Sequence, residues 1–375
     1  MLFDFQEAIV EWAIERERCA IFADCGLGKT IMQLEWLRRI GGRGLVVAPL
    51  AVAQQTRYEG RKFGLTVPYI RDATDIVGPG LYVTNYEMVD HFPAESIDAI
   101  VLDESSILKS IDGKTRGKLI EMYRDVAYRL CCTATPAPND VTELGNHAEF
   151  LGQMTNAEML GAFFVNRDGE WGLKGYAVEA FYEWMATWCM MFTTPDQLGF
   201  PSNGYHLPPL NIEPIFVDVD HASYAQATGR LFVTGMAGVE GRLVARRMTM
   251  AERVKRAAEI IGESDEQWVV WCGLNDEGRQ LHRLLDDSVL VEGADSLGDK
   301  IRDIGKFFDQ STRVLITKVR IGGFGLNLQH CHNMMFLGIS DSYEQYYQAI
   351  RRCWRFGQES QVNVIILTSD IERVV

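Results

Sequence analysis

The stretch ADCGLGKT, Ala23–Thr30, decides how the rest of the chain is interpreted. It follows the apolar run CAIFA (19–23) and leads directly into IMQLEWLRRI, whose spacing of apolar residues predicts a helix. A glycine-rich turn between a buried strand and a helix, ending in Gly-Lys-Thr, is typical of a phosphate-binding loop. Its glycines would let backbone N–H groups approach phosphate oxygens, its lysine would reach the β- and γ-phosphates, and its threonine would ligate Mg²⁺. These residues are Gly26, Gly28, Lys29 and Thr30.

Apolar runs alternate with amphipathic stretches along both halves of the chain. Near-continuous apolar strands separated by helices indicate a parallel sheet that is covered on both faces. The first half is expected to contribute strands at 19–23, 44–49, 80–85, 99–104 and 128–136. The second is expected to contribute strands at 267–273, 288–293, 313–318, 333–338 and 362–368. The sequence therefore predicts an α/β protein with two parallel-sheet domains in tandem.

The pattern breaks between the two halves, in an aromatic-rich segment that we expect to be an insertion or connector. The expected divisions are a first domain at 1–150, the connector at 151–215 and a second domain at 216–375. Glycines in DGEWGLKG predict a hairpin that exposes Trp171, a candidate wedge or substrate contact. Trp184 and Trp188, at helical spacing, are expected to be core residues.

The stretch AIVLDESSILKS (99–110) ends its apolar run in two adjacent acids, Asp103 and Glu104. Taken alone, such a stretch is explained by a strand end that meets water. Beside a phosphate loop, however, an acid at the end of a strand holds Mg²⁺, and a second carboxylate orients or deprotonates the attacking water. We therefore assign the metal role to Asp103 and the water-activating role to Glu104. Both would lie at the carboxyl ends of strands, where open α/β sheets bind ligands.

Seven short stretches follow one another along the chain: ADCGLGKT, VVAPLAVAQQ, YVTNYE, VLDESSILKS, CCTATPAPNDVTELGNHAEFL, VLITKVRIGGFGLNLQHC and YYQAIRRCWRFGQ. In this order they are similar to helicase motifs I, Ia, Ib, II, III, V and VI. The chain resembles the superfamily-two helicases, and within them the Swi/Snf-related translocases, in a compact form similar to those of phages and prophages. This resemblance implies two RecA-like lobes that close on ATP between them and grip nucleic acid across their shared face.

The resemblance also implies roles for residues outside the phosphate loop and the acid pair. Gln6 matches the glutamine that reads adenine. Gln348, Arg352 and Arg355 match the last motif, in which two arginines reach the γ-phosphate as arginine fingers. The two arginines are three residues apart on an expected helix and would therefore share one face. Nucleic-acid contacts are implied at Gln54, Thr84, Asn85 and Thr317.

The net charge of the chain, −14 from 37 basic and 51 acidic residues, counts against nucleic acid as a partner. Contacts through backbone N–H groups and hydroxyls weaken this objection, because they need no Lys or Arg. Basic residues do cluster in GRLVARRMTMAERVKRAAEI, where Arg246, Arg253 and Arg256 recur at spacings that share a helix face. This face is either a track for phosphates or an ordinary solvated surface.

Eight cysteines without C-x-x-C spacing are expected to be reduced and mostly buried, as in a cytosolic protein. The HCH stretch, His330–His332, is interpreted as structural, because alternate strand residues point to opposite faces. No apolar run reaches the roughly 18 residues of a membrane helix, and the start of the chain lacks signal-peptide features. We therefore expect no membrane partner and a cytoplasmic location in a bacterial or phage-infected cell.

The resemblance implies a DNA-stimulated ATPase that uses ATP and Mg²⁺ to move along DNA, with duplex DNA favoured. A helicase that separates the strands of DNA or RNA is a second hypothesis, with a different product. A third is a nucleotide-dependent nucleic-acid-binding module that needs a protein partner for activity. The acidic balance favours this third hypothesis, as does the end of the chain, SDIERVV, soon after the last motif.

Overall fold

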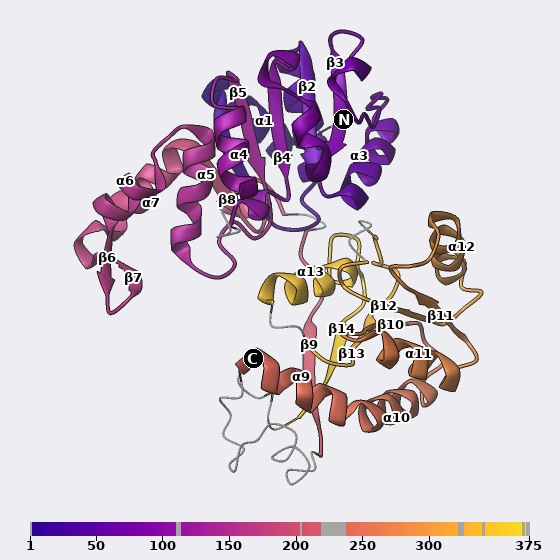
Figure 1. Cartoon of the computed structure of the whole chain (residues 1–375). Helices are drawn as coiled ribbons and strands as arrows, with labels where there is room; N and C mark the ends of the chain where they lie inside the picture. Colours follow the sequence, from indigo (N-terminus) through magenta and orange to yellow (C-terminus); the bar gives the residue numbers. More distant parts are fainter. Residues whose placement is uncertain are drawn as a thin grey trace. The chain divides into compact units, whose positions relative to one another are not determined.

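The chain forms two compact units, Met1–Tyr205 and His206–Val375. The structure is a computed structural model of the whole chain, and Figure 1 traces both units. The residues that it describes are 2–109, 114–202, 205–218, 238–321, 326–339, 342–369 and 372. Each unit is built on one parallel sheet with helices on both faces, as the alternation of apolar and amphipathic stretches predicts.

The first unit contains a six-stranded sheet in the order β3-β2-β4-β5-β1-β8, in which every neighbouring pair is parallel. Its strands are β1 (Arg18–Ala23), β2 (Arg43–Ala48), β3 (Gly80–Asn85), β4 (Ala99–Asp103), β5 (Tyr128–Cys132) and β8 (Cys189–Phe192). Its helices are α1 (Asp4–Arg16), α2 (Lys29–Ile40), α3 (Leu50–Lys62), α4 (Lys114–Met122), α5 (Leu144–Leu151), α6 (Asn156–Phe163) and α7 (Val178–Trp188).

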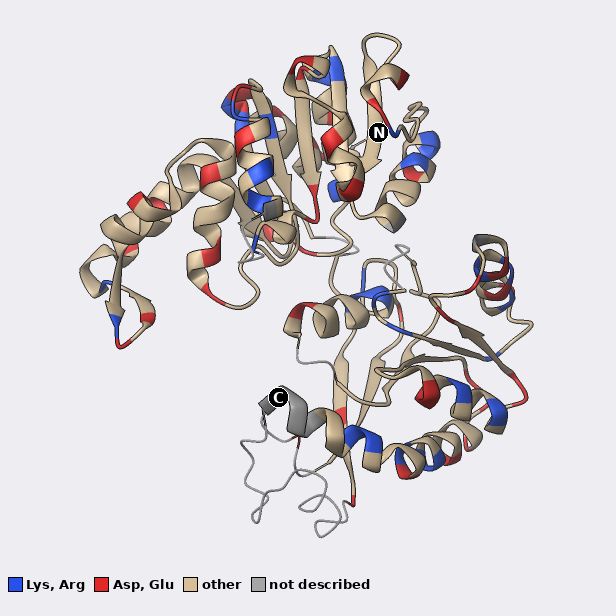
Figure 2. Cartoon of the chain, viewed as in Figure 1, with Lys and Arg blue, Asp and Glu red and all other residues tan. Residues whose placement is uncertain are grey.

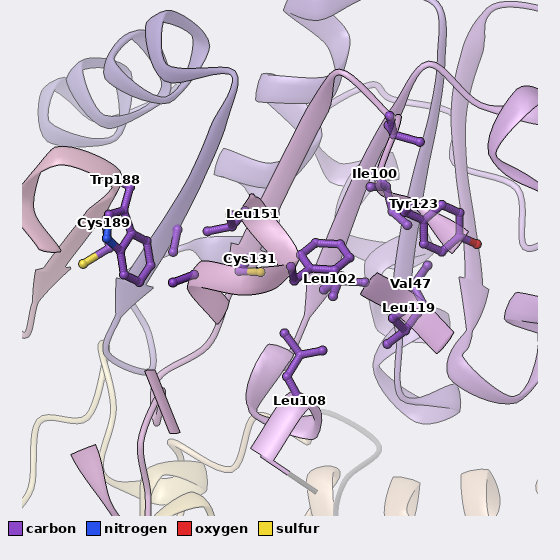
Figure 3. Packing of buried hydrophobic residues seen from close by; sticks show 14 of the residues in the cluster. Val47, Ile100, Leu102, Leu108, Leu119, Tyr123, Cys131, Leu151, Trp188 and Cys189 are labelled. Atoms are coloured by element: carbon purple, nitrogen blue, oxygen red, sulfur yellow. The ribbon is translucent and has the colours of Figure 1, made fainter. Parts of the chain in front are cut away.

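Successive residues of β1 belong to two different hydrophobic clusters, because side chains along a strand alternate between the faces of a sheet. Ile21 packs with residues of α1, α2 and α3 on one face. Phe22 packs with residues of α4, α5 and α7 on the other. Figure 3 shows part of this second cluster, with Leu102, Leu151 and Trp188 among the packed side chains. The sheet is therefore covered on both sides, and its functional groups can gather only at the ends of its strands.

The second unit repeats this design with a six-stranded parallel sheet in the order β11-β12-β10-β13-β14-β9. Its strands are β9 (Leu210–Val217), β10 (Trp268–Trp271), β11 (Ser288–Val291), β12 (Val314–Thr317), β13 (Asn333–Phe336) and β14 (Val362–Ser369). Its helices are α9 (Gly238–Met248), α10 (Met250–Gly262), α11 (Asn275–Leu284), α12 (Leu297–Phe308) and α13 (Tyr343–Cys353). The predicted fold class, two RecA-like parallel-sheet lobes in tandem, is confirmed.

The segment between the predicted lobes, 151–215, is divided between the two units. Its strand β8 pairs with β1 in the first sheet, and β9 pairs with β14 in the second. The predicted hairpin is present as β6 (Phe164–Arg167) and β7 (Glu170–Leu173), with Trp171 41% exposed. Trp188 is fully buried and Trp184 packs against the same cluster, as expected of core residues.

Candidate active site

The phosphate loop lies between β1 and α2, as the sequence predicts. Gly26 and Gly28 adopt φ angles of 89° and 82°, in the left-handed region that favours glycine. A Cβ atom on Gly28 would lie 2.3 Å from the Nε2 atom of Gln6, so a larger residue does not fit there. Lys29 begins α2 and folds back over the loop, donating hydrogen bonds from Nζ to the carbonyl oxygens of Ala23 and Asp24 at 2.8 and 3.2 Å. Thr30 follows it in the first turn of the helix.

Gln6, the predicted reader of adenine, lies against this loop and is buried. Its Nε2 atom donates to the carbonyl oxygen of Leu27 at 3.0 Å, and its Oε1 atom accepts from the backbone N–H of Phe3 at 3.0 Å. The side chain therefore ties the start of α1 to the phosphate loop. Its contact with adenine stays a prediction.

The acid pair follows directly from β4. Asp103 is the last residue of the strand and is only 3% exposed, whereas Glu104 is half-buried and has a φ of 52°, unusual for a non-glycine residue. The Oδ1 atom of Asp103 accepts hydrogen bonds from Gln33 Nε2 at 2.8 Å and from the backbone N–H of Glu104 at 3.0 Å. The Tyr86 hydroxyl donates to the backbone oxygen of Asp103 at 2.8 Å, which fixes the end of the strand.

Burial, followed by the nearby charge of Glu104 as the second cause, raises the pKa of Asp103 to about 6. The hydrogen bond from Gln33 and the charge of Lys29 act in the opposite direction and lower that pKa. A carboxylate in this environment lacks enough positive charge and water to compensate its own charge. A cation bound beside it would supply what is missing.

The end of β5 brings a third group to the same edge of the sheet. The Thr133 hydroxyl lies 3.4 Å from the Oε2 atom of Glu104 and accepts a hydrogen bond from the backbone N–H of Thr135 at 3.1 Å. Since β4, β5 and β1 are adjacent parallel strands, their carboxyl ends meet at one edge. The phosphate loop, the acid pair and Thr133 are therefore brought together in the first unit.

Two buried residues that the sequence analysis did not single out contact the acid pair or the residue next to it. Gln33 on α2 is fully buried and binds Asp103. His147 on α5 is also fully buried, with Nε2 lying 3.1 Å from the Ser105 hydroxyl. Its ring also meets Phe22 edge-on, and burial lowers the pKa of His147 to about 4. A polar residue inside an otherwise apolar helix pattern is the only sequence signal that marks Gln33.

The residues of the predicted arginine motif lie in the second unit. Gln348 and Arg352 are half-buried on α13, where Gln348 Nε2 donates to Glu344 Oε1 at 3.4 Å. Arg355 does not continue this helix, which ends at Cys353 and is followed by a turn with Gly357 at a φ of 89°. The expectation that Arg352 and Arg355 share one helix face is therefore corrected. Their approach to the phosphates stays a prediction.

The residues expected to contact nucleic acid differ in their exposure. Gln54 is exposed on α3 and accepts a hydrogen bond from Arg57 at 2.8 Å. Thr84 and Thr317 are buried, and their hydroxyls donate to the carbonyl oxygens of Ile70 and Val291 at 2.8 and 3.0 Å. Both side chains point inward from their strands, which differs from the expected contact with a phosphate.

Asn85 is likewise 4% exposed, and its side-chain amide is hydrogen-bonded to Tyr69 and Glu87. These bonds use both its oxygen and its nitrogen. A contact between this side chain and a phosphate, as expected from the sequence, would require the amide to leave both partners.

For Arg246 and Arg253, neither alternative from the sequence holds, whether a track for phosphates or a solvated surface. Arg246 and Arg253 are buried, and both pair with Glu372, Arg246 through Nε at 2.8 Å. Burial lowers the pKa of Arg253, and the carboxylate opposes this effect. Arg256 alone of the three is exposed, and it pairs with Glu259 at 3.1 Å. Figure 2 accordingly shows basic and acidic residues interspersed along α10 rather than a basic stripe.

The HCH stretch has ordinary structural contacts. His330 packs against Phe307 and Phe308, Cys331 is buried, and His332 lies 3.3 Å from Glu266. Over the ranges that the structure describes, no group of three or more His, Cys, Asp or Glu residues is arranged to hold a metal. Within the same ranges, no helix combines the length and the apolar character needed to cross a bilayer.

Comparison with known proteins gives matches to both the second unit and the whole chain. Residues 253–357 match the family described as Helicase conserved C-terminal domain. Over 189 residues the chain is 29% identical to Chromodomain-helicase-DNA-binding protein 8 of Xenopus tropicalis, covering 40% of this chain but only 8% of that protein. A solved structure, the Sulfolobus solfataricus SWI2/SNF2 ATPase core in complex with dsDNA, matches with a TM-score of 0.48 and 18% identity, over 98% of this chain and 88% of that one.

Proposed function

We propose that the chain is a superfamily-two helicase of the Swi/Snf-related branch and that it hydrolyses ATP to move along duplex DNA. The observation that carries this proposal is the meeting of the phosphate loop, the acid pair and Thr133 at one edge of the first sheet. A cradle for phosphates beside two carboxylates is suited to phosphoryl transfer to water. DNA as the track follows from the family, and the name of the curated relative includes DNA binding.

Thr30 and Asp103 are the residues that would hold Mg²⁺ together with the phosphates of ATP. Two observations on this chain fit such an ion: Asp103 is buried with a raised pKa, and the nearby Oε1 atom of Gln33 is buried without a hydrogen-bond partner among the described residues. Mg²⁺ would supply positive charge against the phosphate oxygens. Oxygen ligands of this kind are those that Mg²⁺ prefers.

The remaining chemistry is assigned to side chains of the chain itself. Lys29 would leave the carbonyl oxygens that it contacts and bind the β- and γ-phosphates. Glu104 would accept a proton from the attacking water, with the Thr133 hydroxyl beside its carboxylate. Arg352 and Arg355 of the second unit would stabilise the charge that develops on the γ-phosphate. Alternate closing and opening of the two units would then convert hydrolysis into steps along DNA.

The proposal is tested by ATP turnover measured without nucleic acid and then with duplex DNA, single-stranded DNA and RNA at one stated salt concentration. We expect duplex DNA to stimulate turnover most. Lys29→Ala and Glu104→Gln should each reduce stimulated turnover by about 100-fold or more, while Lys306→Ala, at an exposed lysine of α12, should leave it unchanged. Wild-type turnover in either active-site variant would contradict the assignment of the site.

The product of the reaction is tested separately. Displacement of a third strand from a triplex without opening of a fork would support translocation along duplex DNA. Opening of the fork would instead favour a strand-separating helicase. The net charge of −14 favours a further alternative, a nucleotide-dependent binding module that needs a partner protein for activity. Turnover that bare DNA does not stimulate, and that rises when a partner protein is added, would support this alternative.

A further inference from the structure

We propose that Gln33 is a positioning residue that orients Asp103 for Mg²⁺, an inference that rests on the ATP-hydrolysing function proposed above. Gln33 lies in the second turn of α2 and is fully buried. Its Nε2 atom donates a 2.8 Å hydrogen bond to Oδ1 of Asp103, 70 residues further along the chain. The bond joins the helix of the phosphate loop to the strand that carries the acid pair.

The hydrogen bonds around Asp103 are directed to one side of its carboxylate. Gln33 and the backbone N–H of Glu104 both donate to Oδ1, at 2.8 and 3.0 Å. The second oxygen, Oδ2, takes part in neither bond. Two donors on one oxygen fix the rotation of the carboxylate, so that Oδ2 keeps a defined direction for a cation.

The other half of the Gln33 amide points to a ligand. Its Oε1 atom is buried and has no hydrogen-bond partner among the described residues. Buried carbonyl oxygens without a donor are uncommon, because desolvation of the oxygen is then uncompensated. Water molecules that remain on Mg²⁺ are donors, and Mg²⁺ usually keeps several of them. Gln33 therefore has a donor for the carboxylate and an acceptor for the hydrated ion.

The position of Gln33 on its helix explains why it couples two parts of the site. Lys29 and Gln33 are four residues apart on α2 and so lie on the same face. The flanking residues Met32 and Leu34 are fully buried and apolar, as expected of this helix. A glutamine between them has no packing advantage over Met or Leu, whereas an orienting role accounts for it.

The test compares Gln33→Met, which has a side chain of similar length without the amide, with wild type and with Met32→Leu. The control changes an equally buried residue of the same helix that is apolar. ATP binding is measured by thermal shift in EDTA and then over a Mg²⁺ titration. In Gln33→Met we expect the Mg²⁺ concentration for half-maximal stabilisation to rise about 10- to 100-fold, with ATP binding in EDTA unchanged. Met32→Leu should change neither quantity.

The outcomes separate this inference from the proposed function. If wild type binds ATP in a Mg²⁺-dependent way but Gln33→Met has the same Mg²⁺ requirement, the role of Gln33 is refuted and the proposed function stands. If wild type shows no Mg²⁺-dependent binding of ATP, both are refuted. Should Gln33→Met fail to fold, Gln33→Asn keeps the amide but draws it back by one methylene, and the same rise is expected.

Discussion

Replacing Asp103 by Asn should make the nucleotide-free protein more stable while abolishing ATP hydrolysis. Burial, with the charge of Glu104 as a second cause, raises the pKa of Asp103 from 3.8 to about 6. Each pKa unit corresponds to about 1.4 kcal/mol, so ionisation of this carboxyl group costs the folded state about 3 kcal/mol at higher pH. Asparagine has no charge and keeps an oxygen that can accept the hydrogen bond from Gln33.

The sign of the effect sets its pH window. The folded-state pKa of Asp103 lies above the unfolded one, so below about pH 4 the group is protonated in both states and the variant has no advantage. As the pH rises from about 4 to about 6, wild type loses stability relative to Asp103→Asn, and the difference then stays near 3 kcal/mol. Urea denaturation without nucleotide or Mg²⁺, at a series of pH values, measures this difference.

Asp98→Asn is the matched control, because the same residue type is shifted in the opposite direction there. Hydrogen bonds from Arg43 lower the pKa of Asp98 to about 2. This partly exposed carboxylate should therefore stabilise the protein at neutral pH and lose that contribution as the pH falls below about 4. A stability difference for Asp103→Asn that does not depend on pH, or that favours wild type at pH 8, would refute the reasoning.

Two further predictions concern the phosphate loop and the buried ion pairs. Gly28→Ala should weaken ATP binding about tenfold or more, because the Cβ of the new alanine would lie 2.3 Å from the amide nitrogen of Gln6. Equilibrium titration with ATP measures the loss of affinity. Gly64→Ala, at a similar φ with nothing within 4 Å, should bind ATP normally, and equal losses in both variants would exclude the steric explanation. Glu372→Ala should destabilise the second unit by about 3–5 kcal/mol in urea denaturation, because two buried guanidinium groups lose their carboxylate. A loss no larger than that of the exposed Glu259→Ala would contradict this.

The inner strands of both sheets are predictable from sequence because burial on both faces leaves near-continuous apolar runs. β8 and β9 are not, for a physical reason. β8 is a four-residue strand inside an aromatic-rich segment, and β9 is largely exposed and contains Pro214. Each lies at the edge of its sheet and has one neighbouring strand. Edge position alone does not explain this, because β3 and β11 are also edge strands and are predicted from their apolar runs. The short length of β8 and the exposure and proline of β9 remove that signal, and the division of the segment between the two units is missed with them.

The candidate site is predictable where a motif brings its residues together locally, as in the phosphate loop and the acid pair. The direction of single side chains is not, since a one-residue offset along a strand reverses the face. Thr84 and Thr317 therefore point into the protein. Contacts between distant parts of the chain cannot be predicted from local sequence patterns either. Arg253 and Glu372, which bind each other, are 119 residues apart.

Two buried polar clusters among the described residues differ in their charge balance. In the second unit, Arg246 and Arg253 face the carboxylates of Glu277 and Glu372, so positive and negative charges are equal in number. In the first unit, the carboxylates of Asp103 and Glu104 lie together, and Lys29 is the cation whose charge lowers the pKa of Asp103. The first cluster is therefore short of positive charge and the second is not. Under the proposed function, a cation that enters with ATP would complete the first cluster, whereas the second is balanced by its own side chains and acts as a structural tie.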